Sequence, residues 1–329
     1  MDIQDKNSKV VVKNIVDKSN DIKDVVIIGS GPAGYTAAIY LGRAGIKPVL
    51  VSGLLESGGA LMKTGLVENF PGFEQAVEGP VLMQKMQKQA EKFFAQIVSD
   101  DVVDVDFSNK IKLLKLSDGS VLQTRAVIIA VGAKYRHLDI PGEVQFAGKG
   151  VSYCATCDGF FFSGKEVIVV GGGDTAIGEA IFLSSLAAKV TVIHRRDQLR
   201  ATKTLVDKAN SISNIEFVWD SVVSEIRGDE LGVKGIIIKN AKASEKRSFA
   251  CQGVFIAIGH NPSTAIFQNK LDLDDNGYIK VKLGDTSTSE KGVFAAGDCT
   301  DGKYRQAVIA AAAGAKSALD ADEYLKEIG

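Results

Sequence analysis

Two cysteines separated by two residues, Cys154 and Cys157, have the most reactive spacing in this 329-residue chain, and Asp158 follows directly. A pair at this spacing can cycle between a disulfide and two thiols, a change that takes up two electrons. Because the thiolate is the attacking species, the attacking thiol needs a lowered pKa and the departing sulfur needs a proton donor. Asp158 can be that donor if partial burial keeps its carboxyl protonated near neutral pH.

A zinc site is the other chemistry open to a close cysteine pair. Structural zinc would need a second close pair of ligands, but Cys251 and Cys299 stand far apart and single. The histidines His137, His194 and His260 show no pairing of base and nucleophile, so hydrolase chemistry gains no support. The spacing therefore favours a redox-active disulfide without a metal.

A glycine-rich turn far upstream predicts a dinucleotide site. It follows the apolar run Val25–Ile28 and precedes a helical stretch, Tyr35–Leu41, and its residues are Gly29, Ser30, Gly31, Pro32, Ala33 and Gly34. The first glycine allows a tight turn, the second lets a phosphate approach the backbone, and the third brings helix and strand together. The pyrophosphate then rests on N–H groups at the start of the helix. With the next strand, Pro48–Val51, the segment forms a βαβ unit of a parallel sheet.

A second glycine cluster follows the cysteines and repeats this pattern. Its residues are Gly171, Gly172, Gly173, Asp174, Thr175 and Ala176. The strand Val167–Val170 precedes it, and a helix from about Ala176 to Leu186 and the strand Val190–Ile193 follow it. Alanine in place of the third glycine is compatible with the fingerprint. The chain therefore carries two predicted dinucleotide sites around one thiol pair, which suggests a relay that ends in a disulfide.

Basic residues end the second strand of this later unit and bear on the choice of coenzyme. They are His194, Arg195 and Arg196, with Arg200 nearby. Arg195 lies 22 positions after Gly173, about where the residue that reads the ribose belongs. Arginines there favour a 2′-phosphate through charge-assisted, fork-like hydrogen bonds, which points to NADP(H) rather than NAD(H). The alternative is a solvated basic turn.

The elements that position these residues form two similar halves. Apolar strands ending in glycine close both of them, at Ala126–Gly132 and at Val254–Gly259. This duplication predicts an α/β fold with two Rossmann-like, doubly wound, three-layer domains in tandem. A further strand, Gly292–Asp298, and an alanine-rich helix from about Gln306 to Leu325 are too short to form a domain, so we expect them to complete the first one.

The predicted boundaries follow from this arrangement. Residues 1–23 are expected to form a disordered extension, residues 24–134 and 265–329 a discontinuous first dinucleotide-binding domain, and residues 135–264 a second, NADPH-binding domain with the thiol pair. The chain would cross between the domains near Lys134–Arg136 and His260–Thr264. Two connecting strands make a natural hinge.

Composition excludes several other classes. With 39 basic and 40 acidic residues, no long basic run and 7% aromatic residues, nucleic acid is not an expected partner. No apolar stretch approaches 18 residues, and the Lys/Asp/Asn-rich start lacks the apolar core of a signal peptide. A close cysteine pair with two single cysteines is unlike a secreted disulfide scaffold, so we expect a cytoplasmic protein that does not bind membranes.

From about Lys23 to its C-terminus the chain resembles the low-molecular-weight thioredoxin reductases, which are dimeric flavoenzymes with two similar nucleotide domains. The most specific stretch is Cys154–Phe161, followed by Gly171–Ala176 and His194–Asp197. The segments Gly297–Asp298 and Tyr304–Ala307 match nearly as well.

The resemblance implies two cofactors, a catalytic trio and a partner. The catalytic residues would be Cys154, Cys157 and Asp158, with Cys157 nearer the flavin and Asp158 as general acid. The first domain, residues 24–134 and 265–329, would be the FAD-binding domain, and FAD would contact Gly29 to Gly34, Gly58, Gly59, Asn69, Asp298, Arg305, Gln306 and Ala307. NADPH would contact Gly171 to Ala176, His194, Arg195, Arg196 and Arg200. The resemblance also implies a homodimer whose domains rotate during turnover, and thioredoxin as the protein substrate.

Other functions compete with this one. Reductases of peroxidase-type partners usually carry an extra N-terminal domain, which about 24 polar residues do not supply. A ferredoxin-dependent enzyme would not need Arg195 and Arg196, and a dithiol oxidase would not need the second glycine cluster. A nucleotide-sensing module would not need Asp158 beside its thiols.

Overall fold

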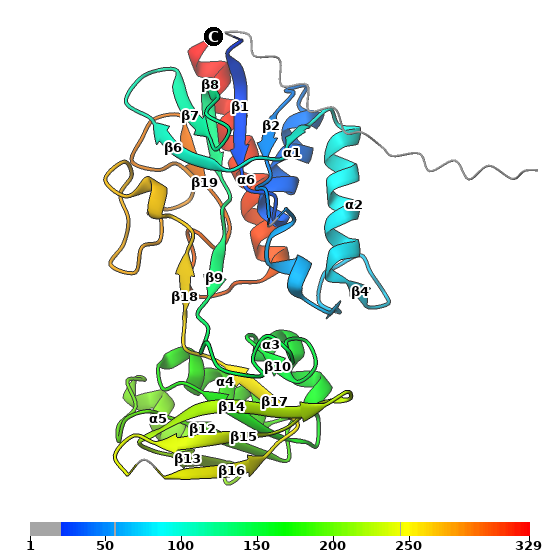
Figure 1. The fold of residues 1–329 in the computed structure, drawn as a ribbon. Helices are drawn as coiled ribbons and strands as arrows, with labels where there is room; N and C mark the ends of the chain where they lie inside the picture. Colours follow the sequence, from blue (N-terminus) through cyan, green and yellow to red (C-terminus); the bar gives the residue numbers. More distant parts are fainter. Residues whose placement is uncertain (1–20, 56, 244) are drawn as a thin grey trace, which may run out of the picture. The chain divides into compact units, whose positions relative to one another are not determined.

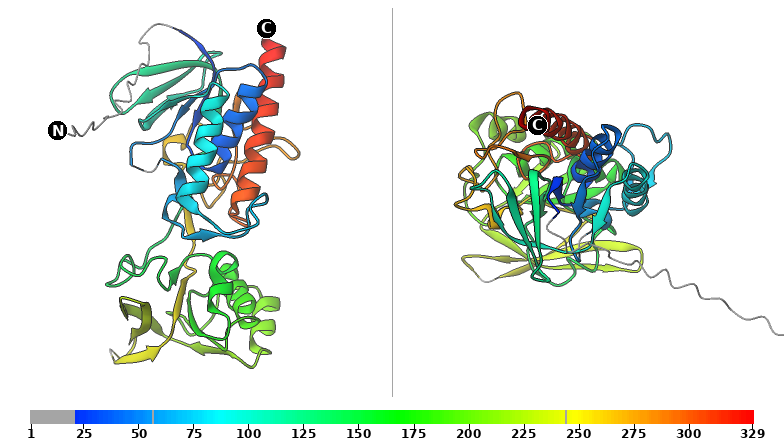
Figure 2. Two further views of the ribbon diagram at one scale, coloured as in Figure 1. Left: turned by 90° about the vertical axis from the view of Figure 1, so that its right-hand side faces the viewer. Right: turned by 90° about the horizontal axis from the view of Figure 1, so that it is seen from above.

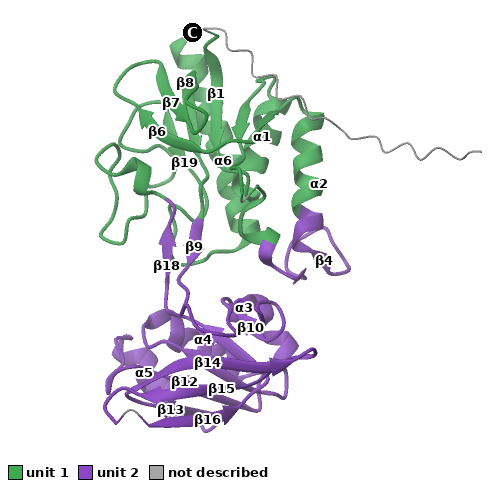
Figure 3. Ribbon diagram, in the orientation of Figure 1, with its two compact units in different colours: residues 1–62, 83–132, 264–329 green, residues 63–82, 133–263 purple. Residues whose placement is uncertain are grey.

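The computed structural model describes residues 21–55, 57–243 and 245–329, and the predicted N-terminal extension lies outside them except for residues 21–23. The described chain divides into two compact units (Figures 1 and 3). Unit 1 comprises the residues up to 62 together with 83–132 and 264–329, and unit 2 comprises 63–82 and 133–263. Among the described residues, no helix is both long enough and apolar enough to cross a membrane.

Unit 1 is built on a mixed sheet whose central strands are parallel. The parallel strands are β5 (Gln96–Val98), β2 (Val49–Val51), β1 (Lys23–Ile28), β8 (Val121–Ile129) and β19 (Val293–Ala295). An antiparallel extension adds β7 (Lys112–Leu116) and β6 (Val102–Asp106). The four residues Val25–Ile28 of β1 are all buried, as expected for a parallel strand with both faces covered.

Three helices run beside one another in unit 1 (Figure 2). They are α1 (Pro32–Arg43), α2 (Gly79–Lys92), whose first turn groups with unit 2, and α6 (Ala307–Ile328). Helix α6 packs closely along α1, because a Cβ at Gly314 would collide with the backbone carbonyl of Ala33. The C-terminal segment therefore joins unit 1 twice, through β19 in the sheet and through α6 on α1.

The segment between β2 and α2 contains only short elements. These are η1 (Gly59–Lys63), β3 (Leu66–Val67) and β4 (Val77–Glu78), and the last two pair with each other. Residues 63–82, which include Asn69, group with unit 2. From the sequence we expect the same residues in the FAD-binding domain, so the observed division differs from the expected one at this segment.

Unit 2 repeats the doubly wound pattern. Its parallel sheet has the order β10 (Val151–Ser152), β17 (Gly253–Ile256), β11 (Glu166–Val170), β12 (Lys189–Ile193) and β13 (Ile215–Val218). Helix α4 (Asp174–Ser184) connects β11 to β12, and α5 (Lys203–Asn210) follows β12. A separate antiparallel sheet consists of β14 (Ser221–Asp229), β15 (Gly232–Asn240) and β16 (Lys246–Ala250). The predicted α/β class with two Rossmann-like sheets in tandem is confirmed.

The core of unit 2 lies on both faces of its parallel sheet. Val167 and Val169 of β11 face the cluster formed with α4, whereas Ile168 and Val170 face the cluster formed with β14 and β15. Successive residues of one strand thus serve two separate cores, which is why β11 is apolar without interruption.

Besides the two ends of segment 63–82, the chain passes between the units after residue 132 and after residue 263. Strand β9 (Ala133–Tyr135) follows the crossing after residue 132, and β18 (His260–Pro262) precedes the crossing after residue 263, before the turn η3 (Ala265–Phe267). The two strands pair antiparallel, with Tyr135 opposite His260. We call this pair the β9–β18 ribbon. That it acts as a hinge stays a prediction.

Candidate redox and dinucleotide sites

Cys154 and Cys157 are joined by a disulfide, with their Cα atoms 5.3 Å apart. A short helix, α3 (Ala155–Asp158), holds the pair, and the N–H groups of Cys157 and Asp158 both donate to the Cys154 carbonyl. The helix is fixed on α4 at Gly159, where a Cβ would lie 3.0 Å from the Phe182 ring. The disulfide predicted from the spacing is therefore formed at the start of a docked helical turn.

Asp158 lies beside the disulfide in a half-buried position. Ser152, which is 4% exposed, donates its hydroxyl to Asp158 Oδ2 at 2.6 Å and accepts the N–H of Cys154 at 3.1 Å. Burial raises the pKa of the Asp158 carboxyl, and the hydrogen bond from Ser152 opposes that rise. The direction suits a proton donor. The role of Asp158 as general acid stays a prediction.

The first glycine cluster forms a turn whose three glycines have different surroundings. Gly29 has a φ of +106°, and a Cβ there would collide with the Ala130 carbonyl. A Cβ at Gly34 would collide with the Gly29 carbonyl, so helix and turn are in contact. Beside Gly31, in contrast, there is open space, and Gly31 is the N-cap of α1 without a side-chain cap. Uncapped helical N–H groups beside an open space fit a pyrophosphate.

Ser30 links this turn to the loop that contains Gly58 and Gly59. Its buried hydroxyl donates to the Ser52 carbonyl at 2.8 Å and accepts the N–H of Gly58 at 2.8 Å. A Cβ at Gly59 would lie 3.2 Å from the Gly31 Cα. The loop thus lies against the phosphate turn, and four of the predicted FAD contacts come together here.

Asp298 approaches the same turn from the C-terminal part of the chain. Gly297, with φ +81°, brings the backbone to Ala33, where a Cβ would lie 3.1 Å from the alanine Cβ. Burial raises the pKa of Asp298 to about 6, while the charge of Arg305 opposes that rise. Arg305 itself donates Nε to the Gly302 carbonyl at 2.7 Å.

The end of this segment starts the long C-terminal helix. Gln306 is the N-cap of α6 with an extended backbone, no side-chain capping hydrogen bond is present, and Ala307 begins the helix. The predicted FAD contacts from 29–34, 58–59, 298 and 305–307 all belong to unit 1. Asn69 does not, since it lies in the exposed segment that groups with unit 2.

The second glycine cluster has the same construction as the first. A Cβ at Gly171 would collide with the Ala257 carbonyl, and one at Gly172 would collide with the His194 ring. Open space surrounds Gly173, which is the N-cap of α4 and again lacks a side-chain cap. Ala176 is fully buried under the turn. This cluster therefore also fits a pyrophosphate at the start of a helix.

The loop after β12 is fastened to this second turn. The N–H of Arg200 donates to the Gly172 carbonyl at 2.7 Å, and Asp174 accepts the N–H of Thr202 at 2.6 Å. His194 is buried, and its Nε2 donates to the Gln198 carbonyl at 3.0 Å. Burial lowers the pKa of His194, so the ring is a neutral packing element of the loop.

Three arginines of this loop extend into solvent. Arg195, Arg196 and Arg200 are exposed, and within residues 21–55, 57–243 and 245–329 none of them forms an ion pair. Three cations beside an uncapped helix can receive a phosphate, because Arg presents paired donors to phosphate oxygens. The predicted NADPH contacts thus gather at one end of the unit 2 sheet.

Sequence reasoning missed several polar residues around the disulfide. Ser152 contacts both Cys154 and Asp158, and Glu143 binds the hydroxyl of Tyr153. No motif marks these residues. The available signal was the polar pair Ser152–Tyr153 directly before Cys154.

The other cysteines are structural in this fold. Cys251 and Cys299 are fully buried, and burial raises the pKa of each thiol to about 12. Cys299 donates its thiol to the Ala296 carbonyl. The part of the chain that the structure describes holds no group of three or more histidine, cysteine or acidic side chains placed to bind a metal ion.

Comparisons with known proteins agree on one family. Residues 23–314 match the model of the pyridine nucleotide-disulphide oxidoreductase family. A thioredoxin reductase of Streptomyces clavuligerus is 50% identical over 306 residues, which are 93% of this chain and 95% of that protein.

Two solved structures are similar throughout. The thioredoxin reductase of Streptococcus pyogenes has 40% identity and a TM-score of 0.89 over 94% of this chain and 100% of its own. The thioredoxin reductase of Giardia duodenalis has 42% identity and a TM-score of 0.88 over 92% of this chain and 98% of its own.

Proposed function

Because this chain belongs to the thioredoxin reductases of the pyridine nucleotide-disulphide oxidoreductase family, we propose that it reduces the disulfide of thioredoxin with electrons from NADPH. FAD and the Cys154–Cys157 disulfide are the proposed carriers. The observation that supports this most directly is the disulfide on its docked helical turn, in the same chain as two glycine-rich helix starts.

FAD is proposed to bind in unit 1, where it supplies two-electron chemistry between NADPH and the disulfide. The open space at Gly31 and the uncapped N-terminus of α1 would hold its pyrophosphate. Asp298, as a carboxylate, would accept hydrogen bonds from hydroxyl groups of the cofactor. Residues 305–307 would place the start of α6 against its ring, where the positive end of the helix favours negative charge.

NADPH is proposed to bind in unit 2. Its pyrophosphate would lie at Gly173 and the start of α4, and its 2′-phosphate would pair with Arg195, Arg196 and Arg200. His194 would act indirectly, because its ring packs on Gly172 and fixes the loop that carries the arginines.

The thiol chemistry balances with thioredoxin as substrate. One thiolate of the reduced pair attacks the thioredoxin disulfide and forms a mixed disulfide. The second cysteine then attacks the first one, which releases the thioredoxin thiol and re-forms the Cys154–Cys157 disulfide. NADPH and one proton are consumed, and thioredoxin gains two thiols. Asp158 would supply the proton to a departing sulfur, since its pKa is raised by burial.

The partner, assembly and location are part of the same proposal. Thioredoxin is the substrate that the names of the relatives indicate, and one relative from Mycobacterium leprae is a bifunctional thioredoxin reductase/thioredoxin. A homodimer is proposed from the resemblance alone. A cytoplasmic location is proposed because the cycle needs a compartment in which thiols stay reduced.

A coupled assay tests the proposal. Purified holoprotein is mixed with NADPH or NADH, a thioredoxin and a disulfide reporter, and NADPH oxidation is followed at saturating thioredoxin. We expect turnover that needs thioredoxin and prefers NADPH. Thioredoxin-independent reduction of a peroxidase-type protein would assign a different partner, and flavin that NADPH fails to bleach anaerobically would reject the reductase assignment.

A further inference from the structure

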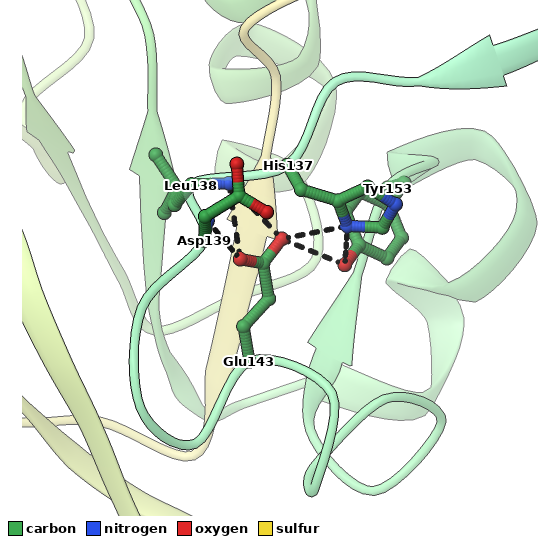
Figure 4. A network of polar contacts seen from close by, with 5 residues as sticks. All are labelled: His137, Leu138, Asp139, Glu143 and Tyr153. Carbon is green, nitrogen blue, oxygen red and sulfur yellow. Dashed lines mark hydrogen bonds and ion pairs between the residues drawn. The ribbon is translucent and has the colours of Figure 1, made fainter.

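A buried carboxylate lies next to the disulfide segment in unit 2, outside the proposed active-site residues. The side chain of Glu143 is 1% exposed and accepts several hydrogen bonds (Figure 4). Its Oε2 accepts the N–H of Asp139 at 2.8 Å and that of Leu138 at 3.0 Å. Its Oε1 accepts the Tyr153 hydroxyl at 2.9 Å and lies 3.0 Å from His137 Nδ1.

These contacts satisfy the oxygens of the Glu143 carboxyl although its side chain is buried. Asp139 has a φ of +55°, and its turn leaves two adjacent N–H groups pointing to one side, where Glu143 satisfies them. Burial, together with the neighbouring Glu143, raises the pKa of Tyr153 far above its usual range. The tyrosine therefore stays protonated and remains a donor to Glu143.

The ring of Tyr153 packs against two other rings, in addition to the hydrogen bond of its hydroxyl. It stacks on Tyr135 with ring centroids 4.8 Å apart, and its centroid lies 5.3 Å from that of the His137 ring, in a T-shaped arrangement. Tyr135 belongs to β9 and also contacts His260 of β18, at 4.7 Å. Tyr153 is therefore packed on the β9–β18 ribbon as well as bonded to Glu143.

Tyr153 lies in the chain where these two contacts can restrict the movement of the first cysteine. Strand β10 ends at Ser152, and Cys154 is the N-cap of α3, so Tyr153 is the single residue between the sheet and the first cysteine. Fixing the backbone of this residue limits where Cys154 can move after the disulfide opens. Two groups held in the right geometry react as if they were present at a very high effective concentration.

We propose that Tyr153 is a positioning residue for the Cys154–Cys157 pair. Its ring on Tyr135 and its hydroxyl on Glu143 keep the reduced cysteines poised to close, and so favour the disulfide over the dithiol. The proposal rests on the proposed function only in requiring that this disulfide opens and closes.

The test measures the thiol–disulfide equilibrium of the holoprotein without NADPH and without thioredoxin. Holoprotein is equilibrated anaerobically in mixtures of oxidised and reduced dithiothreitol, in which one disulfide breaks for each one formed. The thiols are then alkylated, and Cys154 and Cys157 are quantified by mass spectrometry. A failure of the reductase assignment leaves this measurement intact, so the two outcomes are separable.

We expect Tyr153→Ala to shift the equilibrium toward the dithiol by about fivefold or more. The reason is that the free energy of ordering the backbone of one residue corresponds to about a 5- to 30-fold change in an equilibrium constant. Tyr153→Phe keeps the ring and should fall between wild type and Tyr153→Ala. The matched control is Trp219→Ala, which removes a ring stacked on Phe217 in the same unit. It should lower the melting temperature and leave the equilibrium within about twofold.

A Tyr153→Ala protein with wild-type equilibrium, or an equal shift in Trp219→Ala, overturns the proposal. A shift toward the disulfide overturns it as well. If Tyr153→Ala fails to fold, Tyr153→Phe and Glu143→Gln decide, since glutamine has one acceptor oxygen where the carboxylate has two. Both should move toward the dithiol, and two unshifted variants reject the idea.

Discussion

The hydroxyl of Ser152 donates to the carboxyl of Asp158 across 2.6 Å, and the same hydroxyl accepts the N–H of Cys154. One buried side chain thus contacts both the proposed acid and the backbone of the first cysteine. The bond stabilises the ionised form of Asp158 and so limits the rise in its pKa that burial causes.

Replacing Ser152 by alanine should raise the pKa of Asp158 further. A general acid must be protonated, so activity that depends on it is present at low pH and falls as pH rises through that pKa. The descending limb of the pH profile with thioredoxin should therefore move to higher pH in Ser152→Ala. Ser185→Ala, whose hydroxyl donates to the Phe182 carbonyl, is the control and should keep the wild-type limb. A limb that moves to lower pH contradicts the assignment of Asp158.

Cys157→Ser should separate two half-reactions. NADPH should still bleach the bound flavin in an anaerobic titration, because that step needs no thiol, while turnover with thioredoxin should be abolished. Cys299→Ser serves as the control, since that thiol is buried in unit 1 and donates to a carbonyl that a serine hydroxyl can also reach. Full activity in Cys157→Ser would refute the role given to the pair.

Asp298→Asn should stabilise the FAD-free protein and weaken FAD binding. Burial raises the pKa of Asp298 to about 6, so the stability that the protonated form supplies is complete below about pH 4 and is lost as pH rises to 6. At pH 7 the variant should be about 1 to 3 kcal/mol more stable in urea denaturation. The gain should vanish near pH 4, and Asp275→Asn on the surface should show none.

The double variant Arg195→Ala with Arg196→Ala should lose most of its preference for NADPH. Charge-assisted bonds to a phosphate of roughly 2–4 kcal/mol correspond to about a 30- to 700-fold loss in the ratio of kcat/KM for NADPH over NADH. Arg227→Ala removes an exposed arginine that pairs with Glu225, and its ratio should stay unchanged. An unchanged ratio of kcat/KM for NADPH over NADH in the double variant would show that the two arginines do not contact the coenzyme.

Two glycines of the first cluster should respond differently to alanine. Gly31→Ala meets open space and should fold normally, but its methyl group would occupy the proposed phosphate position and abolish FAD binding. Gly34→Ala drives a methyl into the Gly29 carbonyl and should cost about 1–3 kcal/mol or more. Urea denaturation and flavin absorbance distinguish the two. Retention of flavin by Gly31→Ala would move the pyrophosphate elsewhere.

Local patterns in the sequence predicted the central elements of both sheets. The strands β1 and β11 were found because buried parallel strands are apolar without interruption, and the glycines mark the turn after each of them. Helix α4 begins at Asp174 rather than near Ala176, and α6 continues to Ile328, because cap positions lack an apolar signal.

Contacts that involve loops and tertiary packing could not be predicted from local sequence patterns. Glu143 satisfies N–H groups of a turn and a tyrosine ten residues away, and no local pattern encodes such a meeting. The antiparallel sheet β14–β16 was not foreseen, since its strands mix polar and apolar residues and lack the uninterrupted apolar run followed by a glycine cluster that marks β1 and β11. The grouping of 63–82 with unit 2 likewise depends on tertiary packing alone.

The split composition of unit 1 has a consequence for protein synthesis. Residues 133–263 are contiguous and carry a complete parallel sheet, whereas unit 1 lacks β19 and α6 until residues 293–328 have been translated. Domains generally fold as units during translation. The nascent polypeptide should therefore complete unit 2 before unit 1, and the FAD that we propose for unit 1 should bind only after α6 has left the ribosome.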